Sequence, residues 1–146
     1  MADAPGGRLE EQTLNAIRGL GHRLTGPRRG VVREMARASA PVTARALHAA
    51  LADGGTDLAT VYRTLHWLVE LGMARPVVTG GAEHFELVSP DGHSHHLHCD
   101  DCGSLRTVSL CGLDRAVLDR IEREFGFQVA HHRLTFHGRC AGCRAE

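Results

Sequence analysis

Residues 93–103, HSHHLHCDDCG, place four histidines and two cysteines within eleven positions of a 146-residue chain. Imidazole nitrogens and thiolates are the side-chain ligands that zinc and other first-row transition metals prefer in proteins. Eight of the eleven histidines and all five cysteines lie after residue 83. The sequence therefore concentrates its metal-binding chemistry in the C-terminal part of the chain.

Four of the five cysteines form two CxxC pairs. One CxxC turn directs two thiolates at an ion, and two such turns complete the tetrahedral shell of a structural zinc. A single pair could be a redox motif, but two pairs without a thioredoxin-like βαβ setting argue against that interpretation. Cys111 is predicted to pack in a small core or loop, with metal ligation as the alternative. The predicted structural zinc ligands are Cys99, Cys102, Cys140 and Cys143.

The histidines need a separate explanation, because a four-cysteine site leaves no open position on its zinc. In an extended segment alternate side chains face opposite sides, so His93 and His95 share one face. His96 and His98 share the other. Mixed nitrogen and oxygen ligands would permit Zn²⁺, Fe²⁺ or Mn²⁺. The candidates for completing a site on either face are Glu83, His84, Glu86, Asp114, His131 and His132.

The elements that precede this region are predicted to be four helices and a hairpin. Apolar residues recur at helical spacing over 8–20, and Thr25 or Gly26 and then Thr43 begin the next two helices. The fourth helix is the best defined, since Asp57 is a good N-cap and Gly72 a good stop. The segments 74–79 and 83–88, joined by two glycines, are typical of a β-hairpin.

Two helices joined by a short segment and followed by a hairpin are the layout of a winged helix-turn-helix. The second helix of that motif enters the DNA major groove by its N-terminal end. Residues 1–80 carry a net charge of +3 and residues 81–146 a net charge of −3, so the first part favours an anionic partner. The alternative is that Tyr62 and Arg63 of the fourth helix only lie on a solvated face without binding DNA. The predicted DNA contacts are Thr60, Tyr62 and Arg63 on the fourth helix, and Arg23, Arg28 and Arg29 before it.

A turn-rich segment at 89–92, SPDG, is the predicted domain boundary. We therefore expect an α+β protein with a winged-helix DNA-binding domain over 1–88 and a metal-binding domain over 89–146. No apolar run reaches the roughly 18 residues of a membrane span, and the first residues lack a signal-peptide core. A cytoplasmic protein without a membrane partner is the resulting prediction, and there cysteines are metal ligands more often than disulfides.

An enzyme is the competing functional class. His84-Phe85-Glu86 followed by Cys99 and Cys102 echoes a zinc deaminase signature, with Glu86 as general acid/base of a zinc-dependent hydrolase or deaminase. The echo lacks the signature's proline and leaves the second CxxC pair unused. A zinc-ribbon adaptor, the third class, would leave the first 75 residues unexplained. We therefore predict a DNA-binding protein and no enzyme.

In combination, these motifs resemble the ferric uptake regulator family of bacterial metal-responsive repressors, including its zinc uptake regulator branch. The resemblance implies a winged helix joined by a hinge to an α/β dimerisation domain. It implies a homodimer that binds palindromic operators in double-stranded DNA when a regulatory Zn²⁺, Fe²⁺ or Mn²⁺ is bound. It is carried by RLTGPRRGVV (23–32), DLATVYRTLHWLVELG (57–72), HSHHLHCDDCG (93–103) and HRLTFHGRCAGC (132–143).

The resemblance also implies roles for individual residues. The four paired cysteines match the structural zinc ligands. A second site, inside the dimerisation domain, has an aspartate where a glutamate is commoner in the family. Its implied ligands are His93, His95, Asp114 and His132.

The hinge site, which the resemblance makes the control site for DNA binding, matches less well. Glu86 and His96 match, but Ser94 and Pro41 stand where the family has histidines. The metal sensed depends on this site, so the sequence leaves zinc, iron and manganese open. The predicted substitutes for the two missing ligands are Glu83, His84 and His98, with Cys111 as a further candidate.

Overall fold

The computed structural model describes residues 5–89 and 93–145. The chain forms two compact units, residues 1–91 and 92–146, and each folds around its own small sheet. Apart from Ser89, the predicted boundary segment 89–92 lies outside the described residues. No helix in the described ranges has the length and apolar character needed to cross a bilayer.

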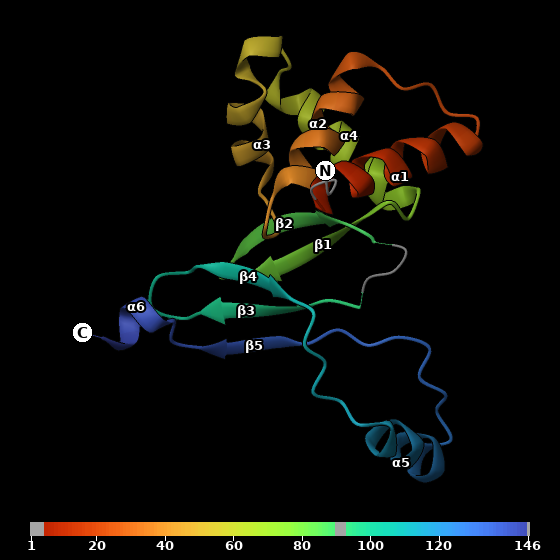
Figure 1. The fold of residues 1–146 in the computed structure, drawn as a ribbon, viewed down its shortest axis with the longest axis vertical. Coiled ribbons are helices and arrows are strands. Elements are labelled where there is room, and N and C mark those ends of the chain that lie inside the picture. Colours follow the sequence, from red (N-terminus) through yellow and green to blue (C-terminus); the bar gives the residue numbers. More distant parts are fainter. Residues whose placement is uncertain (1–4, 90–92, 146) are drawn as a thin grey trace. The chain divides into compact units, whose positions relative to one another are not determined.

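The first unit begins with helices whose start points are set by capping side chains. The side-chain oxygens of Thr43 and Asp57 each accept a hydrogen bond from the backbone N–H three residues later, at 3.1 and 2.8 Å, as good N-caps do. Thr25 does the same more weakly, at 3.5 Å, and Pro27 occupies the first turn that follows. The predicted helix starts are confirmed. The elements are α1 (Pro5–Gly19), α2 (Gly26–Arg37), α3 (Ala44–Ala50), the 3₁₀ turn η1 (Ala52–Gly54) and α4 (Leu58–Glu70) (Figure 1).

A hairpin of β1 (Ala74–Thr79) and β2 (Ala82–Leu87) follows α4. Gly80 and Gly81 form its turn with φ of +57° and +75°, a backbone that two-residue hairpin turns require and glycine allows. Val42 joins the sheet by exchanging backbone hydrogen bonds of 2.9 and 2.7 Å with Phe85. The predicted hairpin is confirmed, and it has a short third strand segment beside it.

The core of the first unit fixes the rotation of α4. Val61, Leu65 and Leu68 are fully buried on one side of this helix, as the apolar stripe predicts. Tyr62 and Arg63 are therefore turned outward and are exposed. The packing partners that are also fully buried include Ile17, Val31 and Val32.

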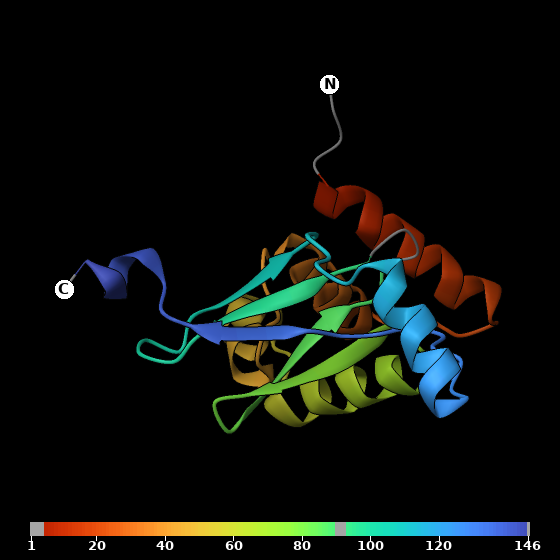
Figure 2. The same ribbon diagram turned by 90° about the horizontal axis from the view of Figure 1, so that it is seen from below.

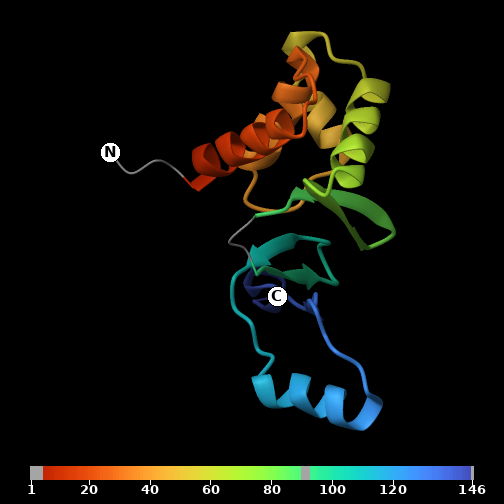
Figure 3. The ribbon, with the colours of Figure 1, turned by 90° about the vertical axis from the view of Figure 1, so that its right-hand side faces the viewer.

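The second unit is a three-stranded sheet in the order β4-β3-β5, with the central strand antiparallel to β4 and parallel to β5. The parallel pairing needs a crossover, and α5 lies in that connection between β4 and β5 (Figure 2). Figures 1 and 3 show α5 standing apart from the sheet at the end of two long connections. The predicted α+β class is confirmed. The elements are β3 (His95–Cys99), β4 (Leu105–Val108), α5 (Arg115–Phe125), β5 (Thr135–Gly138) and α6 (Ala141–Arg144).

Candidate metal centres and nucleic-acid interface

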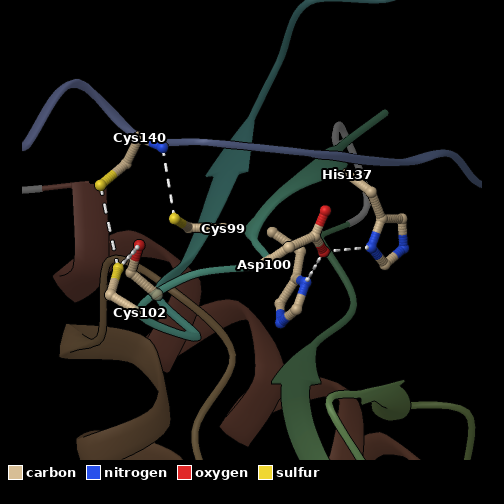
Figure 4. Close-up of polar contacts among 7 residues, drawn as sticks. Cys99, Asp100, Cys102, His137 and Cys140 are labelled. Carbon is tan, nitrogen blue, oxygen red and sulfur yellow. Dashed lines mark hydrogen bonds and ion pairs between the residues drawn. The ribbon is translucent and has the colours of Figure 1, made fainter. Parts of the chain in front are cut away.

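The four cysteines of the CxxC pairs come together in the second unit. Cys99 ends β3, Cys102 lies in the turn to β4, and Cys140 caps α6 (Figure 4). The four sulfurs lie within 4.8 Å of one another. The Sγ atoms of Cys102 and Cys140 are 3.8 Å apart, and thiolates bound tetrahedrally to zinc at about 2.3 Å would be about 3.8 Å apart. The donor set and spacing fit the predicted structural zinc.

The electrostatics of this site favour a cation. Backbone N–H groups of Cys102 and Cys140 directed at Cys99 lower the pKa of its thiol to about 6. Hydrogen bonding with Ser104 lowers the pKa of Cys102, whereas the neighbouring sulfurs of Cys140 and Cys102 raise that of Cys143 to about 12. Cys99 and Cys143 therefore differ strongly in acidity, and a coordinated cation would stabilise both as thiolates.

A second cluster joins three imidazoles to the fifth cysteine. The donor atoms of His93, His95, Cys111 and His132 lie within 4.8 Å of one another. Cys111 Sγ is 3.3 Å from His132 Nε2, close to the roughly 3.6 Å expected for a nitrogen and a thiolate sharing a tetrahedral zinc. The predicted pairing of His93 and His95 on one face is consistent with their 4.6 Å ring separation.

His95 is the buried member of this histidine–cysteine cluster, and it is fully inaccessible. The backbone N–H of Leu134 donates to its Nδ1 at 3.2 Å and fixes the ring. Since a neutral imidazole that accepts at Nδ1 carries its proton on Nε2, ligation by His95 would need the ring to turn over. The other three donors fit a metal without that change.

Asp114, the implied fourth ligand, is not in this cluster. Its carboxylate accepts the N–H of Ala116 at 3.3 Å and caps α5. Cys111, three residues earlier, supplies the fourth donor instead. The sequence favoured packing of Cys111 in a core or loop; it does lie in the loop before α5, but it is exposed and contacts His132. Its position outside both CxxC pairs was the signal that could have identified it.

The predicted hinge ligands belong to two units. Glu86 lies on β2 opposite Arg75 of β1, and the two form an ion pair with an Nη2–Oε1 distance of 2.5 Å. His84 Nδ1 lies 3.3 Å from the carbonyl of Ala82. A site joining the two units stays a prediction. Of its proposed ligands, Glu83, His84 and Glu86 lie on β2, while His96 and His98 lie on β3.

The exposed N-terminal end of α4 carries an ordered polar relay. Asp57 accepts the backbone N–H and the hydroxyl of Thr60 at 2.8 and 2.9 Å. The Thr60 hydroxyl in turn accepts from Arg63 Nη2 at 2.8 Å. Hydrogen bonds from the Thr60 backbone and side chain hold the pKa of Asp57 below its usual value. The relay thus holds the guanidinium of Arg63 at the helix end that a winged helix directs at DNA.

A depression of about 360 Å³ lies between the N-terminal ends of α2 and α4. Arg28 packs its guanidinium 3.8 Å from the centroid of the Trp67 ring and donates to the carbonyl of Arg23 at 2.8 Å. Helix N-termini and guanidinium groups together favour an anion such as a DNA phosphate. Tyr62 instead lies outside the depression and stacks on His66. The lining residues are Arg23, Thr25, Pro27, Arg28, Thr60, Arg63 and Thr64.

The chain is similar in sequence to known metal-responsive regulators. A model described as the ferric uptake regulator family matches residues 19–137. The chain is 38% identical over 92 residues to the ferric uptake regulation protein of Bacillus subtilis (strain 168), and this match spans 61% of each chain.

Two solved structures are similar along most of the chain. The Vibrio cholerae ferric uptake regulator matches with 28% identity and a TM-score of 0.69, covering 86% of this chain and 98% of that one. A zinc uptake regulator complexed with zinc and DNA matches with 26% identity and a TM-score of 0.66, covering 98% and 97%.

Proposed function

Because the chain belongs to the ferric uptake regulator family, we propose that it is a metal-dependent repressor that binds operator DNA as a homodimer. The predicted family is confirmed. Its members are transcription regulators, so the alternative of a zinc-dependent hydrolase or deaminase is not supported. Glu86, the acid/base of that alternative, is ion-paired with Arg75. A repressor acts on the genome, so we place this protein in the cytoplasm.

The histidine–cysteine cluster is the observation that carries metal dependence. Its four donors come from three separate segments, so a shared ion would tie these segments together: His93 and His95 lie just before and at the start of β3, Cys111 before α5 and His132 before β5. Two imidazoles and a thiolate, joined by a third imidazole if the His95 ring turns over, suit zinc, whereas Fe²⁺ and Mn²⁺ favour sets richer in oxygen ligands. We therefore propose zinc as the regulatory metal. The similarity to a regulator that binds zinc and DNA supports this proposal.

The four-cysteine site has a different role in this proposal. Its four thiols leave no position for exchange, so it would hold α6 and the β3–β4 turn together without sensing. The hinge ligands Glu86 and His96 would couple metal to DNA, helped by Glu83, His84 or His98. A metal with ligands on both units would have different affinities for their alternative arrangements, and this difference would shift the equilibrium between them.

The second unit presents surfaces that a second copy would cover. β5 is an edge strand and all four of its residues are exposed, so its free edge can pair with another strand. α5 has no buried residue and stands apart from the sheet (Figure 3). Large apolar side chains that are exposed together on one surface are typical of interfaces. Those around α5 and on β5 are Leu110, Val117, Phe125, Phe127 and Phe136.

A twofold dimer would present two copies of α4 to DNA. Half-sites then lie one helical turn, or a multiple of it, apart, which explains a palindromic operator. Thr60, Tyr62 and Arg63 would approach the base edges, while Arg23 and Arg28, which line the depression, would contact the phosphate backbone.

Operator binding titrated with buffered metals tests the proposal. Purified full-length protein is mixed with a labelled palindromic duplex, and anisotropy is followed against free Zn²⁺, Fe²⁺ and Mn²⁺. We expect zinc to activate binding at the lowest free concentration and a chelator to reverse it. Cys111→Ser should raise the zinc concentration required, whereas Ser109→Ala in the same loop should not. An operator affinity that stays the same with each of the three metals and with the chelator would contradict the proposal.

A further inference from the structure

A third cluster of metal-capable side chains lies in the second unit, and neither metal centre described above uses it. It consists of His98 on β3, Asp100 in the turn that follows, and His137 on β5. His98 and His137 are register partners in the parallel β3–β5 pair, so both side chains lie on one face of the sheet. The carboxylate of Asp100 contacts both rings, and Figure 4 shows it directed at His137.

The three side chains converge on one oxygen atom. Asp100 Oδ1 is 3.2 Å from Nδ1 of His98 and 3.1 Å from Nδ1 of His137. The two ring centroids are 5.1 Å apart. Ligand atoms held at about 2.0–2.2 Å from one ion are roughly 3.0–3.5 Å apart, so a metal could enter with small side-chain rotations.

The members of this histidine–aspartate cluster differ in their exposure to solvent. His98 is 9% exposed, whereas the side chains of Asp100 and His137 are about half exposed. The backbone N–H of Asp100 donates to the carbonyl of Gly138 at 2.8 Å and ties the turn to β5. A groove of about 500 Å³, lined in part by His98, Arg106, Phe136 and His137, adjoins the cluster. The site is therefore built on the sheet and accessible from solvent.

We propose that His98, Asp100 and His137 form a third, exchangeable site for a divalent first-row transition metal such as Zn²⁺. Two imidazoles and one carboxylate leave coordination positions open, unlike the closed four-cysteine site. A bound ion would cross-link β3 to the edge strand β5. In this proposal His98 is a ligand of the third site and not of the hinge site. Glu83 and His84 then remain as the proposed replacements for the two missing hinge ligands. This site does not depend on the proposed DNA binding.

The competing explanation is a hydrogen-bonded trio, in which Asp100 accepts from both imidazoles and no metal binds. The two explanations differ in their response to conservative changes. Asp100→Asn and His137→Gln keep polar groups of similar size but remove strong metal ligands. Loss of an outer-shell partner already weakens a metal site about 10- to 100-fold, so loss of a ligand should weaken this one about 100-fold or more.

Cobalt and zinc titrations of the full-length protein separate the outcomes. Co²⁺ bound by the four-cysteine or histidine–cysteine site gives sulfur-to-metal charge transfer, whereas Co²⁺ at the third site adds only weak visible bands. We expect wild type to bind Co²⁺ without added charge transfer both at the proposed hinge and at this third site, and one such equivalent per chain belongs to the third site. This equivalent should be lost in His137→Gln and Asp100→Asn and kept in His48→Gln, which removes a histidine from α3.

Each variant is first checked for one chelator-resistant zinc per chain, because Asp100 lies between Cys99 and Cys102. If Asp100→Asn loses that zinc, the test depends on His137→Gln alone. The His137 side chain is 55% exposed, so this substitution should leave the four-cysteine site intact. Equal stoichiometry and affinity in wild type and His137→Gln would overturn the proposal and leave the hydrogen-bonded trio. Because no DNA is present, the result is independent of whether the chain is a repressor.

Discussion

Removing the guanidinium of Arg63 tests the position of the DNA-reading surface. The side chain is exposed and its one described contact, to the Thr60 hydroxyl, is a 2.8 Å hydrogen bond on the surface. Arg63→Ala should therefore leave folding intact. A specific arginine contact contributes about 1–3 kcal/mol, which corresponds to about 5- to 150-fold in affinity for each half-site.

The salt dependence decides what Arg63 touches. Each phosphate contact adds about 0.9 to the slope of log affinity against log salt, so losing two in a dimer lowers the slope by about 1.8. Between about 50 and 200 mM salt, this difference in slope changes the ratio of wild-type to Arg63→Ala affinity about 12-fold. If Arg63 reads a base instead, the slope stays and discrimination between the operator and a scrambled duplex falls.

Fluorescence anisotropy with both duplexes at several salt concentrations and saturating zinc measures these quantities. The matched control is Arg37→Ala, which removes the same charge from the far end of α2, where Arg37 pairs with Glu34. The zinc content and the dimer mass of both variants should equal those of wild type. If Arg63→Ala binds like Arg37→Ala at every salt concentration, the N-terminal end of α4 is not the surface that holds DNA.

Three further predictions concern the metal sites. Cys140→Ser should lose the chelator-resistant zinc and unfold the second unit, because structural zinc supplies about 10–16 kcal/mol in small zinc peptides; unchanged zinc content and melting temperature would rule out the four-cysteine site. Cys111→Ser should weaken competitive zinc binding more than Asp114→Ala, which instead loosens the start of α5; the reverse order would return Asp114 to the ligand set. The double variant Glu86→Ala, His96→Ala should lose metal-activated operator binding while keeping its circular dichroism, and activation that survives would remove the hinge from the control mechanism.

Local elements of the fold were predictable because their causes are local. Thr43 and Asp57 cap helices through backbone groups a few residues away, and the turn at Gly80 and Gly81 depends on two residues. The apolar stripe of α4 likewise needs only helical spacing to predict which side is buried. From these elements the winged helix, and the outward position of Arg63, follow with short connections.

The four-cysteine site was predictable for a chemical reason. Cys99 and Cys140 are far apart in sequence, but each belongs to a CxxC pair that supplies half of a tetrahedral shell. Zinc requires both halves, so the partnership can be inferred without knowledge of the chain path between them.

The remaining sites depend on contacts that spacing does not encode. Cys111 and Asp114 lie in one loop, and the choice between them as partner of His132 depends on the N-cap of α5, which engages the aspartate. His137 is 37 residues from Asp100, and it meets His98 only because β5 pairs in parallel with β3 in one register. A shift of one residue would turn His137 to the other face of the sheet. The sequence alone determined the local caps, turns and ligand pairs, and the tertiary structure decided which distant side chains meet, because strand register and crossover path depend on packing along the whole chain.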